Sequence, residues 1–409
     1  MPRLPPALRP FWPYGKRAYT LATRGVAGAS MRLSRRRHGH LPLRCADTVA
    51  AAAAGDASVR VHVVGPATSV DRPPPAGVPQ PPPPLLREAH ADFAEQVVVD
   101  LPDGRVLGPH RAVISGDGTF LHGLVRYFGT TRAREHPMFL HPRVDGPQVQ
   151  DDVVAVLASR GDGNYYHFLH DVIARLSVLE RWRDAPAIDR YYLPQTTRFQ
   201  RDLAALAGID GDRIIDSDAA PHLQARRLVV PALPDLDLGH PAWATDALRE
   251  RLLPAEVAAV PGRCIYVTRG RQRHNRIVLN EDEVLAALAA YDVQVVDPSA
   301  LTVAEQIRTF AEAELIVAPH GAALANLTFA SAGAAVVELF APDFVQGCYW
   351  KLAATVPGLS YRYLVGEGRT SPRRAGLGVS SDILLDVRSL KRVVDGVAPA
   401  ASSDRRATS

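Results

Sequence analysis

Cysteine and lysine are scarce in this chain of 409 residues, and a long apolar run is missing. The three cysteines, Cys45, Cys264 and Cys348, lie far apart and form neither a disulfide framework nor a CxxC metal motif. This usage favours a reducing compartment. Because no run of about 18 apolar residues is present, we expect no transmembrane helix. The hydrophobic content of 47% and the charged content of 22% exclude wholesale disorder, collagen and coiled coil.

Acidic residues are missing from residues 1–46, which hold ten of the 47 lysines and arginines. The rest of the chain carries 37 basic and 43 acidic residues, a balance of −6. The isoelectric point near 9.0 therefore stems from the N-terminal segment and does not indicate a nucleic-acid-binding domain. Only Lys16, Lys351 and Lys391 are lysines. Arginine is thus the default basic residue, and a functional role for any one arginine needs further support.

The first 92 residues show no periodicity typical of a packed core. Residues 1–46 have the composition of a transit peptide, but a disordered extension or a true start at Met31 is the favoured explanation. From Pro66 to Pro84, nine of nineteen residues are proline, which is typical of a polyproline spacer. We predict a disordered basic tail and polyproline linker over 1–92, and a flexible tail over 396–409.

Strand and helix patterns alternate from residue 150, which predicts parallel sheets with helices on both faces. A Pro/Gly-rich stretch at 231–262 divides the series. We therefore predict an α/β fold with two doubly wound, Rossmann-like domains facing a cleft, at 93–240 and 241–395. The expected strands are 96–100, 105–107, 111–115, 153–158, 190–193, 227–230, 264–269, 293–296, 315–318 and 336–339. The expected helices are 164–182, 198–207, 243–253, 281–290, 303–313 and 322–330, the fifth opened by a capping box from Thr302 to Glu305.

A narrow polar stripe marks the otherwise apolar helix predicted at 164–182. Helical spacing places His167, Asp171 and Arg175 on one side, flanked by His170. A mostly buried helix keeps such a stripe where it meets solvent or a cleft, or where the charges pair. An i,i+4 pair of Asp171 with Arg175 is therefore an alternative explanation. A zinc site from His167, His170 and Asp171 is also geometrically allowed, although a further ligand is not evident.

Two segments of the second half suit a phosphate. At 315–329 an apolar strand runs into Pro319-His320-Gly321 and a helix that begins with small residues. A helix N-terminus at the carboxyl end of a strand binds phosphate well, although a plain tight turn has the same pattern. At 266–276 the strand end and the loop after it carry Arg269, Arg271, Arg273 and Arg276. They form a candidate pyrophosphate clamp, or else a solvated basic loop.

Other catalytic signatures are weak. Three DxD pairs crowd residues 210–237, which is typical of a chance occurrence in an Asp-rich region, and neither a GxSxG elbow nor a P-loop is present.

The segments GNYYHFLHDVIARL, YVTRGRQRHNRIVLNEDEV, LTVAEQIRTFAEAELIVAPHGAALANLTFA and VVELF, in this order, resemble glycosyltransferase family 61. The resemblance covers about residues 95–390 and is strongest at 150–345. It implies a GT-B fold, an inverting mechanism and a nucleotide-sugar donor, generally without a metal. The first domain then becomes the acceptor side and the second the donor-binding side.

The resemblance also assigns residues to roles. In the first domain, Asp171 assisted by His167 becomes the candidate catalytic base, with Asp in place of the Glu of many members. The expected acceptor-side residues are Asn164, Tyr165, His170 and Arg175. In the second domain, the expected donor-binding residues are Arg269, Arg276, Glu305, His320, Gly321, Ala322, Asn326 and Glu338. Ala323 stands where Gly is common in the family, and Glu338 is expected to bind a ribose hydroxyl.

The sequence thus predicts an inverting hexosyl- or pentosyltransferase that acts in polysaccharide or capsule biosynthesis. We expect no cofactor and no metal, with a nucleotide sugar as substrate and a glycan or other hydroxyl group as acceptor. No nucleic-acid partner is expected. The expected location is cytoplasmic, with peripheral membrane contact through the basic tail. Two alternatives remain open at this point, a non-catalytic nucleotide-sugar or glycan-binding protein on the same fold and a metal-dependent hydrolase using His167 and His170.

Overall fold

A computed structural model of the chain describes residues 12–36, 39–127, 129–141, 143–234, 239–260, 262–270, 276–368 and 381–397. The fold is α/β and separates into two compact units. The N-terminal unit comprises Tyr14–Thr68 and Ala94–Pro234, and the C-terminal unit comprises Met1–Pro13, Ser69–Phe93 and Asp235–Ser409. The chain therefore supplies the C-terminal unit from more than one segment, and each unit is described by itself.

The C-terminal unit is built on a six-stranded sheet in which every pair of neighbours is parallel. The strands are β14 (Cys264–Val267), β15 (Val293–Val296), β16 (Leu315–Pro319), β17 (Ala335–Phe340), β18 (Ser360–Val365) and β4 (Ala76–Val78). Their order is β15-β14-β16-β17-β18-β4. Strand β4 comes first in the chain, and the later part of the chain begins at β14, adds β15 on one side, and then returns to add β16, β17 and β18 on the other, where β18 meets β4. In such doubly wound sheets the crevice for a ligand lies where the order reverses, here at the carboxyl ends of β14 and β16.

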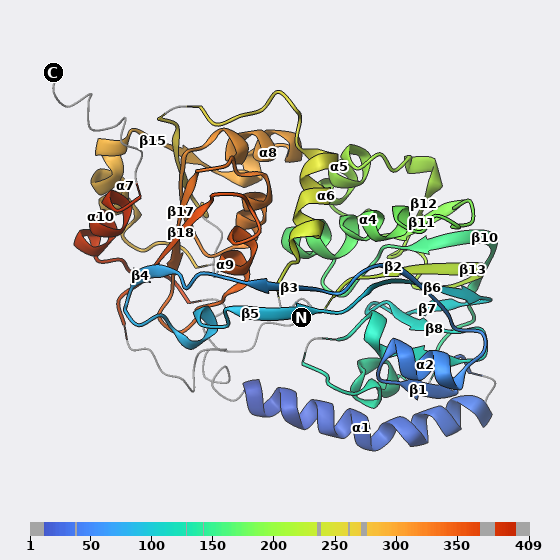
Figure 1. Ribbon diagram of the computed structural model, residues 1–409. Coiled ribbons are helices and arrows are strands. Elements are labelled where there is room, and N and C mark those ends of the chain that lie inside the picture. Colours follow the sequence, from blue (N-terminus) through green and yellow to red (C-terminus); the bar gives the residue numbers. More distant parts are fainter. Residues whose placement is uncertain are drawn as a thin grey trace. The chain divides into compact units, whose positions relative to one another are not determined.

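Helices cover both faces of this sheet (Figure 1). On one face, α7 (Glu281–Leu288) and α10 (Val387–Asp395) pack on a cluster that includes Tyr266, Val317 and Val337. The remaining helical segments are α6 (Ala242–Leu252), α8 (Val303–Glu312), α9 (Cys348–Ala353) and the 3₁₀ helix η11 (Ala322–Phe329). The capping box that opens α8 is present, since Thr302 and Glu305 exchange hydrogen bonds.

The N-terminal unit contains a ten-stranded mixed sheet with the path β1-β9-β8-β7-β13-β10-β11-β12, and β6 joins β2 to β13. Its parallel part is β13-β10-β11-β12. The strands are β1 (Arg44–Ala46), β2 (Arg60–Gly65), β6 (Gln96–Pro102), β7 (Arg105–Leu107), β8 (Ala112–Ile114), β9 (Thr119–Leu121), β10 (Gln148–Val156), β11 (Arg190–Leu193), β12 (Ile214–Asp216) and β13 (His222–Ala232). The helical segments include α1 (Trp12–Arg36), α2 (Val49–Gly55), α3 (Tyr165–His167), the π-helical turn η6 (Phe168–Ile173), α4 (Arg175–Glu180) and α5 (Arg198–Leu206).

The strands expected after residue 95 are present, but the N-terminal unit is not the purely parallel, doubly wound domain that the alternation predicts. Strands β6, β7 and β8 form antiparallel pairs on one side of β13. The helical pattern begins only at residue 164, so the sequence gives direct support for parallel strands only beyond that point. Short strands joined by tight turns before it form the antiparallel part.

The prediction of a disordered tail and linker over 1–92 is wrong for the described residues of that range. Strands β1 and β2 join the sheet of the N-terminal unit, and β4 is the edge strand next to β18. Strands β3 (Thr68–Asp71) and β5 (His90–Phe93) pair with each other. Proline is tolerated beside an edge strand because no second neighbour needs its N–H group. Residues 1–11, 37–38 and 398–409, which include most of the expected C-terminal tail, lie outside the described residues.

The longest helix, α1, is one of the segments that the sequence did not predict. No helix in the part of the chain that the structure describes is both long enough and apolar enough to cross a membrane.

Candidate functional site

The polar stripe of the N-terminal unit lies on an irregular helix that follows β10. Gly161 has φ of +76°, a conformation that favours glycine, and turns the chain out of the loop after the strand. The side chain of Asn164 then caps the helix by accepting a hydrogen bond of 2.9 Å from the N–H of Tyr166. Across η6 the hydrogen bonding widens, since the N–H of Ala174 donates to the carbonyl of Leu169, five residues earlier. Such π-helical turns are rare and occur frequently at functional sites.

His167 and Asp171 form a close pair on this helix. Nδ1 of His167 lies 2.8 Å from Oδ2 of Asp171, and the side chains are 24% and 2% exposed respectively. Burial raises the pKa of Asp171, and the hydrogen bond from His167 opposes that rise. A carboxylate at Nδ1 keeps the proton on that nitrogen, so Nε2 of the imidazole becomes the basic atom. The arrangement can therefore accept a proton at His167 while Asp171 holds the ring.

This geometry exchanges the roles expected for His167 and Asp171. Asp171 is too deeply buried to meet an acceptor hydroxyl, whereas His167 is partly exposed. The remaining carboxylate oxygen, Oδ1 of Asp171, is buried and has no hydrogen-bond partner among the described residues. The spacing of the two residues can be read from the sequence, but which of them reaches the surface cannot.

Arg175 is an internal brace and not an acceptor-side residue, since its side chain is 3% exposed. Its Nε donates to the backbone carbonyl of Asp171 at 2.8 Å, and its terminal nitrogens donate to the carbonyls of Pro231 and Leu124 at 2.6 and 3.4 Å. Burial lowers the pKa of Arg175 to about 10. The alternative of an i,i+4 pair is therefore met only in part, because the hydrogen bond goes to the backbone of Asp171 and not to its carboxylate.

The other expected acceptor-side residues differ in exposure. His170 is 2% exposed and packs against the Tyr166 ring at 5.0 Å between centroids, so it offers no surface to an acceptor. Asn164 is exposed, and Tyr165 is half-buried with its ring edge-on to Phe199 at 5.7 Å.

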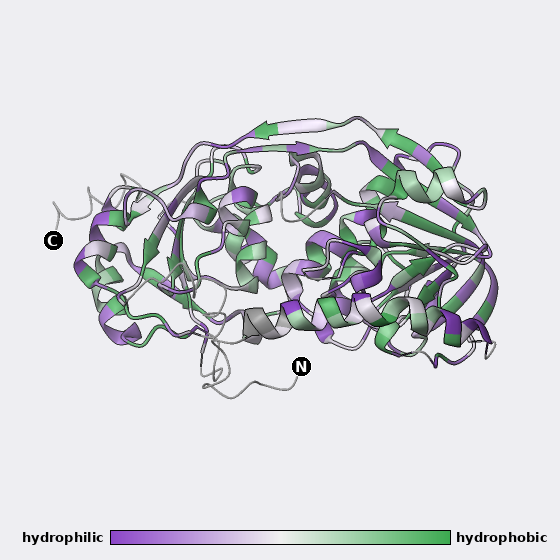
Figure 2. Ribbon diagram, turned by 90° about the horizontal axis from the view of Figure 1, so that it is seen from below, coloured by the Kyte–Doolittle hydropathy of each residue, from purple (hydrophilic) through white to green (hydrophobic). Residues whose placement is uncertain are grey.

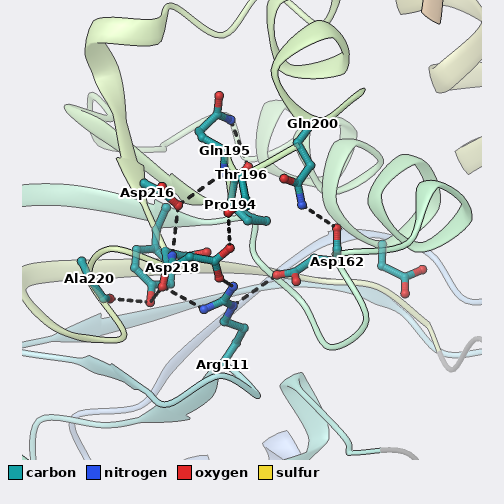
Figure 3. A network of polar contacts seen from close by, with 12 residues as sticks. Arg111, Asp162, Pro194, Gln195, Thr196, Gln200, Asp216, Asp218 and Ala220 are labelled. Atoms are coloured by element: carbon teal, nitrogen blue, oxygen red, sulfur yellow. Dashed lines mark hydrogen bonds and ion pairs between the residues drawn. The ribbon is translucent and has the colours of Figure 1, made fainter. Parts of the chain in front are cut away.

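A buried arginine that sequence reasoning missed anchors the loop before this helix (Figure 3). Nε of Arg111 lies 3.2 Å from Asp162, one terminal nitrogen lies 2.5 Å from Asp218, and the other donates to the carbonyl of Ser217 at 2.8 Å. Asp162 is tied in turn to α5, because Gln200 donates to its carbonyl at 3.0 Å. The signal that could have found Arg111 is weak, since a single arginine after a turn is common in this chain.

The same network accounts for one of the DxD pairs. Oδ1 of Asp216 accepts from the backbone N–H groups of Gln195 and Asp218, and Asp218 also accepts from Thr196. Asp235 and Asp237 lie outside the described residues. Within the described ranges, no three His, Cys, Asp or Glu side chains are grouped so that they could hold a metal ion, and this includes His167, His170 and Asp171.

In the C-terminal unit, two arginines converge on one carbonyl at the point where the strand order reverses. Arg269 follows β14, and its terminal nitrogen donates to the carbonyl of His320 at 3.1 Å. Nε of Arg276 donates to the same carbonyl at 2.9 Å. Burial and the charge of Arg276 lower the pKa of Arg269 to about 10, and burial lowers the pKa of Arg276. Two partly desolvated cations side by side form a site that an anion would stabilise. Arg271 and Arg273 lie outside the described residues.

His320 is fixed from behind by a buried acid. Its Nδ1 lies 2.5 Å from Oε1 of Glu338 on β17, and the Tyr361 hydroxyl on β18 donates to Oε2 of Glu338 at 2.5 Å. The His320 ring also stacks on Phe340 with 5.3 Å between centroids. Glu338 is 0% exposed, so it holds His320 in place and does not reach a ribose hydroxyl as the sequence predicts.

Gly321 and Ala322 complete this site. Gly321 is in an ordinary extended conformation with φ of 178°, so its backbone would suit any residue. A Cβ atom there would instead overlap the Arg269 guanidinium. The glycine is therefore needed for the close approach of Arg269. Ala322 and Ala323, in the first turn of η11, are half-buried.

Two predicted donor-binding residues have structural partners instead. Asn326 is 0% exposed, and its amide donates to Gln306 at 3.3 Å and to the carbonyl of Ala323 at 3.1 Å. Glu305 accepts from the N–H and the hydroxyl of Thr302 at 2.7 Å each, as the capping box of α8. The structure therefore brings together Arg269, Arg276, His320, Gly321 and Ala322 at the site and leaves Asn326 inside the unit.

Part of the chain matches known proteins. The family model described as Glycosyltransferase 61 matches residues 165–337. Protein O-linked-mannose beta-1,4-N-acetylglucosaminyltransferase 2 of Bos taurus is 36% identical over 109 residues, which are 25% of this chain and 18% of that protein. The Mus musculus protein of the same name is 34% identical over 127 residues, 29% of this chain and 21% of the relative.

A relative with a different name matches a similar length. The EGF domain-specific O-linked N-acetylglucosamine transferase of Drosophila melanogaster is 32% identical over 139 residues, 31% of this chain and 26% of that protein. The chain thus covers about a fifth to a quarter of the length of these relatives.

Proposed function

We propose that this chain, whose residues 165–337 match the model of glycosyltransferase family 61, is an enzyme that transfers a sugar from a nucleotide-sugar donor to a hydroxyl acceptor. The observation that carries the proposal is the convergence of Arg269 and Arg276 on the carbonyl of His320. Both arginines follow β14 and the carbonyl of His320 follows β16, at the edge where a doubly wound sheet binds its ligand.

The cation pair is suited to a diphosphate. Breaking the bond between sugar and donor leaves negative charge on the departing diphosphate, and preorganised positive groups stabilise that charge in the transition state. Arg269 and Arg276 would supply it through their guanidinium groups, and the partly exposed first turn of η11 would add backbone N–H groups. Glu338 and Tyr361 contribute indirectly, because they fix His320, whose carbonyl aligns both arginines.

Removal of the acceptor proton falls to the pair in the N-terminal unit. In the proposed reaction, the acceptor oxygen attacks the anomeric carbon while a base takes its proton. His167 is the better candidate for this base, because it is the exposed member of the pair, and Asp171 then orients the ring and stabilises the imidazolium. The family resemblance assigns these two roles the other way round, with Asp171 as the base.

We also propose the stereochemistry, the fold class and the metal requirement of the reaction. Attack in a single displacement would invert the anomeric configuration, which NMR of a fresh product can read. We retain a GT-B fold on the basis of the family match and of the α/β sheet in each unit. We also propose that no metal is needed, because the two arginines supply the positive charge at the diphosphate. Turnover that survives excess chelator is the expected result.

The names of the relatives provide a first choice of donor sugar. The named relatives transfer N-acetylglucosamine, one to O-linked mannose and the other to EGF domains. We therefore propose a nucleotide-activated N-acetylhexosamine as the first donor to test. A polysaccharide of the capsule type remains the proposed acceptor.

The experiment is a donor-hydrolysis and transfer screen combined with calorimetric binding of nucleoside diphosphates. Charge-assisted contacts are worth about 1.5–3 kcal/mol each. Arg269→Ala and Arg276→Ala should therefore each weaken diphosphate binding by roughly 10- to 100-fold, while the unfolding midpoint barely moves. Arg308→Ala, on the exposed side of α8 in the same unit, is the matched control and should bind as the parent does.

Two results would contradict the proposal. Unchanged affinity in both arginine variants would remove the diphosphate site. Tight binding of the whole donor panel without hydrolysis or transfer would instead favour a non-catalytic nucleotide-sugar-binding protein.

A further inference from the structure

Helix α1 is attached to the N-terminal unit by one row of small side chains. Thr23, Ala27, Ser30 and Ser34 are all buried, and their spacing of three and four residues places them along one side of the helix. Ala27 packs into the cluster that contains Leu107, Ile114 and Phe120. The inner side of α1 is therefore packed against the N-terminal unit.

The outer side of α1 carries positive charge without any acid. Its exposed basic residues are Arg17, Arg24, Arg32, Arg35 and Arg36. At about 100° per residue, Arg17, Arg24 and Arg35 lie along nearly one line, away from the buried row. In the part of the chain that the structure describes, none of these five side chains is paired with a carboxylate. Residues 1–46 contain no Asp or Glu at all.

A large apolar side chain shares this outer surface, since Leu21 is 56% exposed and lies among the arginines. Val26 and Leu33 are 41% and 39% exposed, but their helical spacing places them on the flank opposite Arg17, Arg24 and Arg35. Figure 2, seen from below, shows hydrophilic and hydrophobic residues interspersed along α1. Arginines beside an exposed leucine suit a membrane interface, where the guanidinium groups meet anionic headgroups and the apolar side chain enters the acyl boundary.

We propose that the outer face of α1, made of Arg17, Leu21, Arg24, Arg32 and Arg35, docks on a membrane surface that contains anionic lipids. The arginines meet lipid phosphates, and Leu21 enters the boundary between headgroups and acyl chains. A nucleic acid would match the charge but would leave the exposed Leu21 side chain in water. The proposal goes beyond the transfer reaction and does not depend on it.

The charge distribution of the rest of the chain supports a single docking face. Beyond residue 46 the chain carries 37 basic and 43 acidic residues, so it is net negative and is repelled by an anionic surface. Attraction confined to one helix then gives the bound protein a defined orientation.

The test is co-sedimentation of the full chain with vesicles of phosphatidylcholine alone or with 30% phosphatidylglycerol. We expect binding only to the anionic vesicles, and release as salt is raised. The variant R17E/R24E/R32E/R35E should bind at least about 100-fold more weakly. The control R143E/R183E/R388E/K391E makes the same charge change at exposed positions outside α1 and should keep binding.

A second variant separates lipid insertion from charge alone. Leu21→Ser keeps all arginines and should lower vesicle binding by about tenfold. Val26→Ser, on the opposite flank of α1, is the control and should bind vesicles as the parent does. Circular dichroism and the thermal unfolding midpoint establish that each variant is folded, since these side chains are exposed. Equal binding by the α1 variant and the parent would overturn the proposal. It would also be overturned by binding to short DNA, RNA or a second copy of the chain without binding to vesicles.

Discussion

At the scale of single residues, burial assigns the roles within the pair of His167 and Asp171. Both members lie four positions apart, so spacing alone treats them as equivalent. The packing of Arg175 against the carbonyls of Pro231 and Leu124 closes the helix over Asp171 and leaves His167 at the surface. Those carbonyls come from segments far away in the sequence. The sequence therefore predicts that the two residues lie together but not which of them is exposed.

His167→Gln and Asp171→Asn test this order. If His167 is the base, His167→Gln should lower turnover by about 10²–10⁴-fold while donor affinity is kept. Asp171→Asn should lower turnover less, because the imidazole remains but loses its orienting carboxylate. Steady-state kinetics and calorimetric donor binding measure the two effects. A nearly active His167→Gln combined with an inactive Asp171→Asn would return the base to Asp171.

Arg111 provides a second test at this scale, as a positioning residue. It touches Asp162 and Asp218 and holds the loop from which the His167 helix begins. Arg111→Met should lower kcat and leave the donor Kd unchanged, since the donor arginines belong to the other unit. Breaking a buried ion pair costs about 3–5 kcal/mol, and we expect the lower end because the Asp218 side chain is 48% exposed.

Partial turnover in a milder variant separates a positioning role of Arg111 from a purely stabilising one. Asp162→Asn keeps the loop backbone bond from Gln200 but removes one charge, so it should retain part of the turnover. Arg226→Met, at an exposed arginine that pairs with Asp151 in the same unit, should change neither kcat nor the unfolding midpoint. An Arg111→Met enzyme with normal kcat would show that the network only stabilises the unit.

At the scale of elements, the sequence predicts well where periodicity is long and poorly where elements are short. Strand 293–296 and strand 190–193 have the bounds that the pattern predicts. Strand β4 has three residues between prolines, and no period can be read from three residues. What makes it a strand is its partner, because Gly77 lies opposite Tyr363 so closely that a Cβ atom would overlap its carbonyl.

The proline-rich segment is thus part of the C-terminal unit, and this leads to a prediction about stability. Leu86 is 0% exposed, and Lys351 pairs with Glu88 at 2.7 Å. Leu86→Ala should cost about 2–5 kcal/mol of unfolding free energy because it leaves a cavity. Denaturant titration measures it, with the neighbouring Leu85→Ala as the control, since Leu85 is 37% exposed. Equal effects of the two variants would show that the segment does not pack.

Deletion of residues 1–90 would remove β1, β2 and β4 together with Leu86. From composition alone such a deletion should be harmless. The structure predicts instead that the truncated chain fails to unfold cooperatively, which a loss of the sharp transition in circular dichroism would establish.

At the scale of the whole molecule, buried histidines make stability depend on pH. Burial lowers the pKa of His122 to about 4, of His136 to about 3 and of His222 to about 4. These side chains are neutral in the folded protein, but an unfolded histidine binds a proton below a pKa of about 6.5. The unfolded state then binds more protons, so stability falls as pH drops from about 6.5 toward 4.

Urea titrations at pH 7.0 and at pH 5.0 measure this change. We expect a lower midpoint at pH 5.0, with the N-terminal unit unfolding first, because all three histidines belong to it. His136→Gln should reduce the difference between the two midpoints. A midpoint that does not change between pH 6.5 and pH 4.5 would contradict the prediction.

Because the C-terminal unit is built from separate segments of the chain, its sheet is completed only after β18 has been synthesised. Strand β4 emerges from the ribosome early, but its sheet partner β18 lies near the other end of the chain. The N-terminal unit is complete once Pro234 has emerged and can fold while translation continues. At about 5–20 residues per second, the edge strand then waits roughly 10 s more for its neighbour, beside an already folded unit. Its flanking prolines are poor templates for pairing with another chain, and they protect the nascent protein from aggregation during that interval.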